Sequence, residues 1–162
     1  MINWLQQFPH ELAIIILAML PLTELRAAIP IGIGVYHMAP WIAYGLSIFG
    51  NMIPLVCLFV FLPGLLELLS RKSPRLHVLL ENYFFRLSKK HEQMLNTYGA
   101  LFLFVFVAIP HPGGGVWSAS ALAILFRMKR PLAIVAIVCG TLVSGLIVLT
   151  LTLESIHVLK AL

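Results

Sequence analysis

The sequence predicts an all-α integral membrane protein made of two inverted repeats, each a re-entrant helical hairpin followed by a transmembrane helix. Hydrophobic residues make up 60% of the chain and charged residues 10%, and mean hydropathy is +0.99, far from a soluble domain. The apolar stretches 10–38 and 98–127 are too long for one crossing of about 20 residues and too short for two. Each precedes a longer apolar run, 41–69 and 132–153.

The first apolar stretch is interrupted near its middle by the sequence Pro-Leu-Thr-Glu-Leu-Arg at 21–26. Each arm then has about half the length of a full crossing, so the interruption is expected near mid-membrane. Non-helical backbone survives at that depth only where protein buries it or where it lines a wet cavity. We therefore expect a site at this interruption. The following run, 41–69, is expected to cross the membrane completely.

Residues 71–92 predict a basic amphipathic helix that joins the two repeats. Its apolar residues recur at helical spacing, with basic residues between them: Leu76, Leu79, Leu80, Tyr83, Phe84 and Leu87. Such a helix is expected to lie on an anionic membrane surface, and its simplest role is to connect the two halves.

The second half repeats this order. The stretch 98–127 is interrupted by Pro-His-Pro-Gly-Gly-Gly at 110–115, and the run 132–153 provides the last crossing. The triplet Ala-Ile-Pro occurs at 28–30 and 108–110, and Gly50-Asn51 corresponds to Gly140-Thr141. These matches indicate an internal duplication within one membrane domain, 1–162, with repeats at about 1–70 and 93–162.

Basic residues set the expected orientation. They cluster in 71–90 and 127–130, so both segments are expected in the cytoplasm and both termini outside. The halves are then inverted, and the protein is a multi-pass protein of a bacterial-type inner (plasma) membrane. Because the basic clusters flank apolar spans, they indicate topology and not nucleic-acid binding.

Glu24 and Arg26 are the strongest candidate site residues, because charges at membrane depth usually face a cavity, a partner or a substrate. Thr23 is expected to cap a helix beginning at Glu24. Gly113, Gly114 and Gly115 are expected to form a backbone nest before a second helix. Two helix N-termini and Arg26 would then attract an anion, with Glu24 as the proton- or ion-coupling group. The alternative is a buried charged pair that only ties the hairpins together.

Weaker candidates surround this site. His111 either relays protons or bonds a neighbouring carbonyl, and Trp117 either stacks on a ligand or wedges between helices. Asn51 is expected to bond another helix. Glycine and serine residues in both crossing runs allow close helix approach within a subunit or between subunits, which is compatible with a homo-oligomer.

The sequence has no arrangement typical of an enzyme. It has no nucleophile with an adjacent base, no nucleotide-binding loop and no metal-ligand spacing. We therefore expect neither catalysis, nor a cofactor, nor a metal. The expected partners are membrane lipids and the transported substrate.

The two interruptions resemble the small multidrug export protein family. The resemblance rests on Glu-Leu-Arg-Ala-Ala-Ile-Pro at 24–30, Gly50-Asn51, Tyr-Gly-Ala at 98–100, and Ile-Pro-His-Pro-Gly-Gly-Gly-Val-Trp at 109–117. It implies functional roles for Glu24, Arg26, Pro30, Pro110, Pro112, Gly113, Gly115 and Trp117. Gly114 stands where this family is expected to carry threonine. A distant relation to DedA-like proteins implies re-entrant hairpins and translocation of polyprenyl-phosphate lipids.

Together these features predict a secondary transporter or flippase for an anionic or phosphate-bearing small molecule or lipid, with proton coupling. One alternative is export of small cationic drugs, as the family name implies. Another is a non-transporting membrane assembly factor. An intramembrane enzyme acting on lipid phosphates would need a base, and only His111 qualifies.

Overall fold

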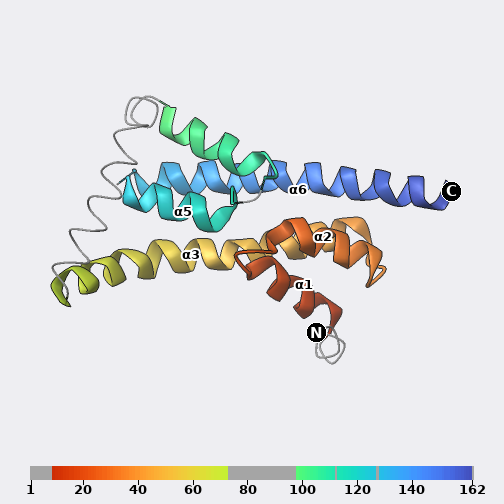
Figure 1. Ribbon diagram of the computed structural model, residues 1–162, viewed down its shortest axis with the longest axis horizontal. Helices are drawn as coiled ribbons and strands as arrows, with labels where there is room; N and C mark the ends of the chain where they lie inside the picture. Colours follow the sequence, from red (N-terminus) through yellow and green to blue (C-terminus); the bar gives the residue numbers. More distant parts are fainter. Residues whose placement is uncertain (1–8, 73–97, 112, 127, 162) are drawn as a thin grey trace.

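The computed structural model describes residues 9–72, 98–111, 113–126 and 128–161, and the regular structure in these residues is helical. The helices are α1 (His10–Met19), α2 (Glu24–Gly34), α3 (Pro40–Lys72), α5 (Val116–Leu125) and α6 (Arg130–Ala161). A further helix, Tyr98–Ala108, precedes α5 and is green in Figure 1. Most of the predicted amphipathic helix at 71–92 lies outside the described residues, as does Pro112.

Both shorter apolar stretches fold as two short helices separated by a break, at the positions that proline and glycine predict. Residue Leu20, directly before Pro21, is extended at ψ 140°, because a proline disfavours helical backbone at the residue before it. The second helix of the first hairpin, α2, begins at Glu24, as the sequence predicts. Glu24 and Arg26 therefore belong to the first turn of a helix.

The two long helices, α3 and α6, run antiparallel along the molecule (Figure 1). The Tyr44 hydroxyl on α3 donates a hydrogen bond of 3.1 Å to the carbonyl of Leu142 on α6. Gly145 packs against the rings and methyl groups of the same α3 face, at Tyr44 and Ile48. This contact sets the register of the two helices.

Both long helices contain a segment long and apolar enough to cross a membrane: Pro40–Leu65 and Arg130–Val158. Only 33% and 50% of their most apolar windows are buried within the molecule. Large apolar side chains such as Trp41, Phe61 and Leu151 lie on the outer surface. A surface of this kind is disfavoured in water and favoured in hydrocarbon.

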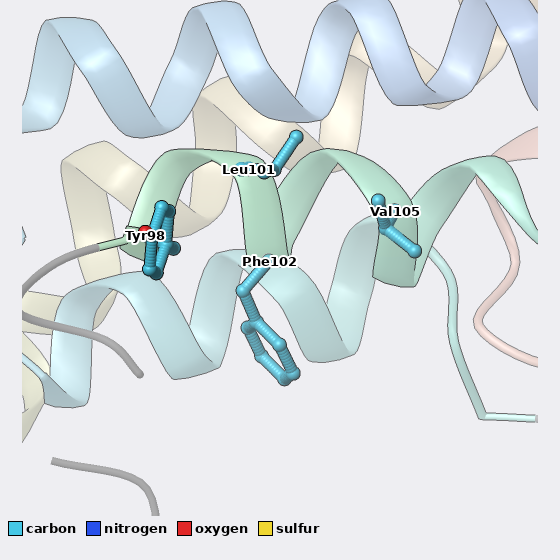
Figure 2. A pocket seen from close by; sticks show the side chains of 4 residues that line it. All are labelled: Tyr98, Leu101, Phe102 and Val105. Atoms are coloured by element: carbon cyan, nitrogen blue, oxygen red, sulfur yellow. The ribbon is translucent and has the colours of Figure 1, made fainter. Parts of the chain in front are cut away.

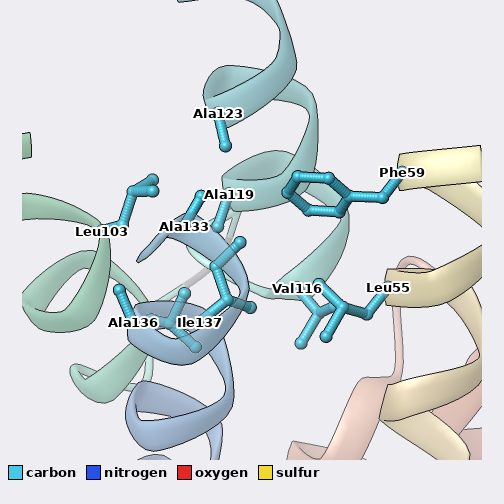
Figure 3. Packing of buried hydrophobic residues seen from close by; sticks show 10 residues of the cluster. Leu55, Phe59, Leu103, Val116, Ala119, Ala123, Ala133, Ala136 and Ile137 are labelled. Atoms are coloured by element: carbon cyan, nitrogen blue, oxygen red, sulfur yellow. The ribbon is translucent and has the colours of Figure 1, made fainter. Parts of the chain in front are cut away.

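The apolar core is divided between the two hairpins. One cluster joins α3, the helix Tyr98–Ala108, α5 and α6 (Figure 3), and contains Leu55, Phe59, Leu103, Val116 and Ile137. A second joins α2 to α6 through Leu25, Ile29, Val148 and Leu149. A third joins α1 to α2 through Ile14, Ala18 and Ala28. Each hairpin is thus held against the long helices by its own apolar contacts.

Two glycines, one on each long helix, make similar close approaches. A β-carbon at Gly50 would meet the Ile15 carbonyl at 2.6 Å, and one at Gly140 would meet the Phe104 carbonyl at 2.8 Å. Each glycine therefore lets a long helix approach the first arm of one hairpin. The repeated Ala-Ile-Pro triplet is not equivalent in this sense. Residues 28–30 lie inside α2, whereas residues 108–110 end a first arm, so this part of the predicted match is wrong.

Candidate functional site

The tips of the two hairpins meet near the centre of the molecule (Figure 1). The first hairpin contributes its break at 20–23 and the first turn of α2. The second contributes its break at 109–115 and the first turn of α5. Contacts between these segments join residues that are far apart in the sequence.

Glu24 occupies the N-terminus of α5. Its side chain is buried, with 5% of its surface exposed, and its carboxylate accepts hydrogen bonds from the backbone N–H groups of Val116 and Trp117. These amides have no partner within their own helix, and the helix dipole also favours a negative charge there. The preceding residue, Gly115, leaves space for the carboxylate, because a β-carbon at that position would overlap it.

The backbone of Glu24 is strained. Its φ is +46°, a left-handed conformation that costs a non-glycine residue roughly 1–3 kcal/mol. Thr23 does not cap α2 as the sequence predicts. Its hydroxyl instead donates a hydrogen bond to the carbonyl of Leu17 in α1, so it ties the break back to the first arm.

Arg26 crosses from the first hairpin to the second. Its terminal guanidinium nitrogen Nη1 donates a hydrogen bond to the backbone carbonyl of His111. Its charge also attracts the Glu24 carboxylate, although the two side chains bond different parts of the second hairpin. The Nε atom of Arg26 is buried and has no hydrogen-bond partner among the described residues.

Trp117 makes the reciprocal contact. Its indole Nε1 donates a hydrogen bond of 3.0 Å to the carbonyl of Met19, at the end of α1. Thus the second arm of each hairpin donates to a carbonyl at the end or in the break of the other hairpin's first arm. We call Glu24, Arg26, Met19, His111 and Trp117 the tip latch.

The glycine-rich break is shaped around His111. Gly113 has φ +85°, and the Gly114 amide donates to the His111 carbonyl at 3.1 Å. A β-carbon at Gly114 would overlap the imidazole ring. The His111 Nδ1 atom lies 3.0 Å from the Ile109 carbonyl, which is the neighbouring-carbonyl contact that the sequence left open.

A family model described as "Putative small multi-drug export protein" matches residues 24–147, which include every residue of the tip latch except Met19. The chain belongs to this family. Neither a curated protein nor a solved structure matches the chain. Family membership and the two long apolar helices together give the protein a membrane location.

Pro30, for which the resemblance implies a role, lies apart from the latch. It is inside α2, one turn beyond Arg26, and lacks the N–H group that would bond the Arg26 carbonyl. Pro30 and Gly34 line a groove of about 340 Å³ against α6, with Val148, Leu151, Thr152, Ser155 and Ile156. Pro110 lies in the second break, directly after Ile109.

A second groove lies on the outer face of the helix Tyr98–Ala108, away from the latch. It has a volume of about 360 Å³ and is lined by Tyr98, Leu101, Phe102 and Val105 (Figure 2). These four side chains come from one stripe of one helix and are almost entirely apolar. The groove offers no group that would orient a polar substrate.

Two contacts at the hairpin tips are not among those that the sequence predicts. The Met19 carbonyl accepts the Trp117 indole, and Ser118 donates to the carbonyls of Gly113 and Gly115. Backbone acceptors carry no signal in the sequence of side chains. A serine in the first turn of a glycine-preceded helix is the only pattern that points to the second feature.

Proposed function

We propose that this protein is a transporter whose two hairpins enter the membrane from opposite faces and meet at its midplane. The antiparallel long helices and the equivalent packing of Gly50 and Gly140 support an inverted repeat. In secondary transporters of this plan, the half-helix N-termini at the midplane bind the substrate. Here the tip latch closes the path between the faces.

The substrate that the latch fits best is an anionic or phosphate-bearing molecule. The observation that carries this proposal is the Glu24 carboxylate on the N-terminal amides of α5. The N-terminal amides of α5 bind this carboxylate, and Arg26 attracts it. The same place therefore suits an anionic group with several oxygen acceptors. A phosphate group of the substrate would take the same donors.

Transport is coupled to protons because the substrate anion replaces the Glu24 carboxylate on the α5 amides. When Glu24 takes up a proton, its carboxyl group loses its negative charge and competes less strongly with an anion for the Val116 and Trp117 amides. The substrate anion then binds those amides and Arg26 while the proton stays on Glu24. Proton and anion are therefore bound together and move in the same direction.

The groove between α2 and α6 supports a substrate with a hydrocarbon chain. It begins at Pro30, one turn from Arg26, and is lined mainly by apolar groups. A phosphate at Arg26 would leave an attached chain free to follow this groove towards surrounding lipid. A polyprenyl phosphate has both parts.

The second candidate is export of small cationic drugs. It is favoured by the family description and by the buried carboxylate of Glu24. A cation would bind the deprotonated carboxylate, so protons and drug would compete and move in opposite directions. Arg26 and the two helix N-termini oppose this binding.

The test is flux through the purified protein in liposomes, using polyprenyl phosphate and a cationic dye with and without a pH gradient. We expect polyprenyl-phosphate movement that follows the proton gradient. Glu24→Gln keeps an oxygen acceptor for the α5 amides but cannot exchange a proton, so it should remove the gradient dependence.

Dye movement opposite to the proton gradient, lost in Glu24→Gln and improved in Arg26→Gln, would replace the anionic substrate with drug export. If cells that carry the Glu24→Gln variant behave as the wild type does, and the purified protein moves neither polyprenyl phosphate nor the dye, a non-transporting assembly factor would be favoured.

A further inference from the structure

The apolar packing divides the molecule into two bodies. Among the described residues, none of the three apolar clusters contains side chains of both hairpins. The first hairpin packs on residues 43–50 of α3 and 148–153 of α6. The second packs on residues 52–59 of α3 and 133–140 of α6 (Figure 3). We call each hairpin, with the helix segments on which it packs, the first body and the second body.

On α3 the boundary between the bodies lies at Asn51. Gly50 packs against α1 of the first hairpin, whereas Met52 packs on the cluster of the second. Pro54 follows within one turn, and because proline has no N–H group, the Gly50 carbonyl lacks its helical hydrogen bond. The helix is therefore weakened at the point where it passes from one body to the other.

On α6 the boundary lies at Thr141. Gly140 packs against the first arm of the second hairpin, whereas the Leu142 carbonyl accepts the hydroxyl of Tyr44 in the first body. The Thr141 hydroxyl donates to the carbonyl one turn before it, at 2.7 Å, a contact that often bends helices. The predicted internal duplication pairs Thr141 with Asn51, so both long helices change body at corresponding residues.

The contacts that the structure shows between the two hairpins are the hydrogen bonds of the tip latch. They are made by the side chains of Glu24, Arg26 and Trp117. A hydrogen bond contributes only modestly to net stability, because water takes its place when it breaks. The latch can therefore open without loss of the apolar packing inside either body.

We propose that α3 bends at residues 50–54 and α6 at residues 140–145, so that the two bodies tilt relative to each other and open the tip latch. This inference rests on the proposed transport function and adds the motion that would expose its site. Proline and small residues are the usual places where helices bend. Because each long helix has one hairpin packed on each of its halves, a bend in either helix separates the hairpin tips.

Asn51 favours the open arrangement. Its side chain is fully buried in the closed arrangement, and neither Oδ1 nor Nδ2 has a hydrogen-bond partner among the described residues. Burying both ends of an amide unpaired is costly. A bend beside Asn51 lets water reach this amide and the free carbonyl of Gly50. The amide therefore brings the closed and open arrangements closer in free energy.

The test is the distance between two spin labels on the purified protein in detergent, which does not depend on transport. The two exposed native cysteines are replaced first. One pair of labels, at Leu22 and Ile109, joins the tips of the two hairpins, and a second pair, at Leu12 and Val35, lies within the first body. All four positions are exposed.

Trp117→Phe removes one hydrogen bond of the latch. We expect the tip pair in this variant to show a second, longer distance, with an open-to-closed ratio roughly tenfold above that of the wild type, the equivalent of one hydrogen bond. The pair within the first body should keep a single, unchanged distance, because the hairpin moves as a unit.

Changes at the α3 boundary should reverse this effect. In the Trp117→Phe protein, Pro54→Ala restores the missing N–H group and should reduce the longer distance. Asn51→Leu removes the unpaired amide and should reduce it as well. The matched controls are Pro63→Ala, further along the same helix and away from the boundary, and Ser47→Ala, whose hydroxyl is already paired. Both should leave the ratio unchanged.

A single tip distance in every variant, or equal effects of Pro54→Ala and Pro63→Ala, would overturn the inference. A changed distance within the first body would also overturn it, because the hairpin would then deform instead of tilting. Proton-dependent polyprenyl-phosphate flux in such a protein would leave the proposed function intact. Conversely, a tip distance that depends on Pro54 and Asn51, without such flux, would support the hinges and contradict only the proposed function.

Discussion

At the scale of single residues, three side chains of the tip latch make the contacts between the two hairpins. The side chains of Glu24, Arg26 and Trp117 each reach the opposite hairpin, and Gly115 leaves the space that the Glu24 carboxylate occupies. Each of these side chains bonds a backbone group of the opposite hairpin. The contact therefore depends on where that backbone lies, and less on which side chain the contacted residue carries.

Arg26→Gln should weaken binding of the phosphate probe at every pH. Arginine keeps its charge throughout the usable pH range, so its contribution does not titrate. Loss of a charge-assisted hydrogen bond of about 1.5–3 kcal/mol predicts roughly ten- to hundredfold weaker binding. Ligand titration of the purified protein measures this. Arg130→Gln, an exposed change at the start of α6, is the control, and an equal loss in both variants would contradict the role of Arg26.

Gly115→Ala should release the Glu24 carboxylate from α5. The new β-carbon would overlap that carboxylate, and φ at Gly115 is −95°, which alanine adopts without strain. Leaving buried groups unpaired predicts a loss of about 1–3 kcal/mol of stability. Thermal unfolding in detergent checks this. The control is Gly64→Ala, which should not destabilise the protein because a β-carbon at Gly64 meets nothing within 4 Å. A Gly115→Ala variant as stable as the wild type would show that Glu24 does not need this space.

At the scale of helices, the arrangement depends on close approach. Gly50 and Gly140 bring the long helices against the first arms, while Pro30 and Gly34 leave a groove between α2 and α6. The first arms of the hairpins are therefore packed closely against the long helices, whereas the groove between α2 and α6 leaves space for the hydrocarbon chain of a substrate. This division predicts that blocking the groove affects transport and not folding.

Gly34→Leu should reduce polyprenyl-phosphate flux by filling the groove. A β-carbon at Gly34 meets nothing within 4 Å, so the side chain should be accepted without loss of stability. Gly45→Leu is the matched control, because Gly45 is equally open but lies on α3. Flux of polyprenyl phosphate in liposomes, compared with that of a short-chain phosphate, checks the prediction. Equal flux in both variants would exclude the groove as the path of the chain.

At the scale of the whole molecule, the proposed inversion predicts opposite locations for two loops. In a protein with Cys57 and Cys139 replaced, since both are exposed, single cysteines at Ser73 and Lys160 should react with an impermeant thiol reagent from opposite faces of the membrane. The basic residues around 71–90 predict that Ser73 faces the cytoplasm. Labelling of both positions from the same face would rule out the inverted repeat.

Much of the fold could be predicted because its causes are local. Length and hydropathy determine which helices can cross a membrane, and Pro21 and Pro110 interrupt helices without help from distant residues. The sequence also singled out Glu24 and Arg26, since charges are costly in an apolar environment.

Tertiary structure alone decided how these residues are paired. Arg26 and His111 are 85 positions apart, so no spacing rule joins them, and the Met19 carbonyl is not visible in a pattern of side chains. Thr23 does not cap α2: its backbone is helical, at φ −94° and ψ −49°, and not extended as at a typical N-cap, and its hydroxyl donates to the Leu17 carbonyl of α1. Asn51 was expected to find a partner, but in the packed bundle it has none among the described residues. Local steric and hydrophobic preferences determine where helices begin and end, whereas buried polar groups are paired by whichever atoms the completed packing brings within hydrogen-bonding distance.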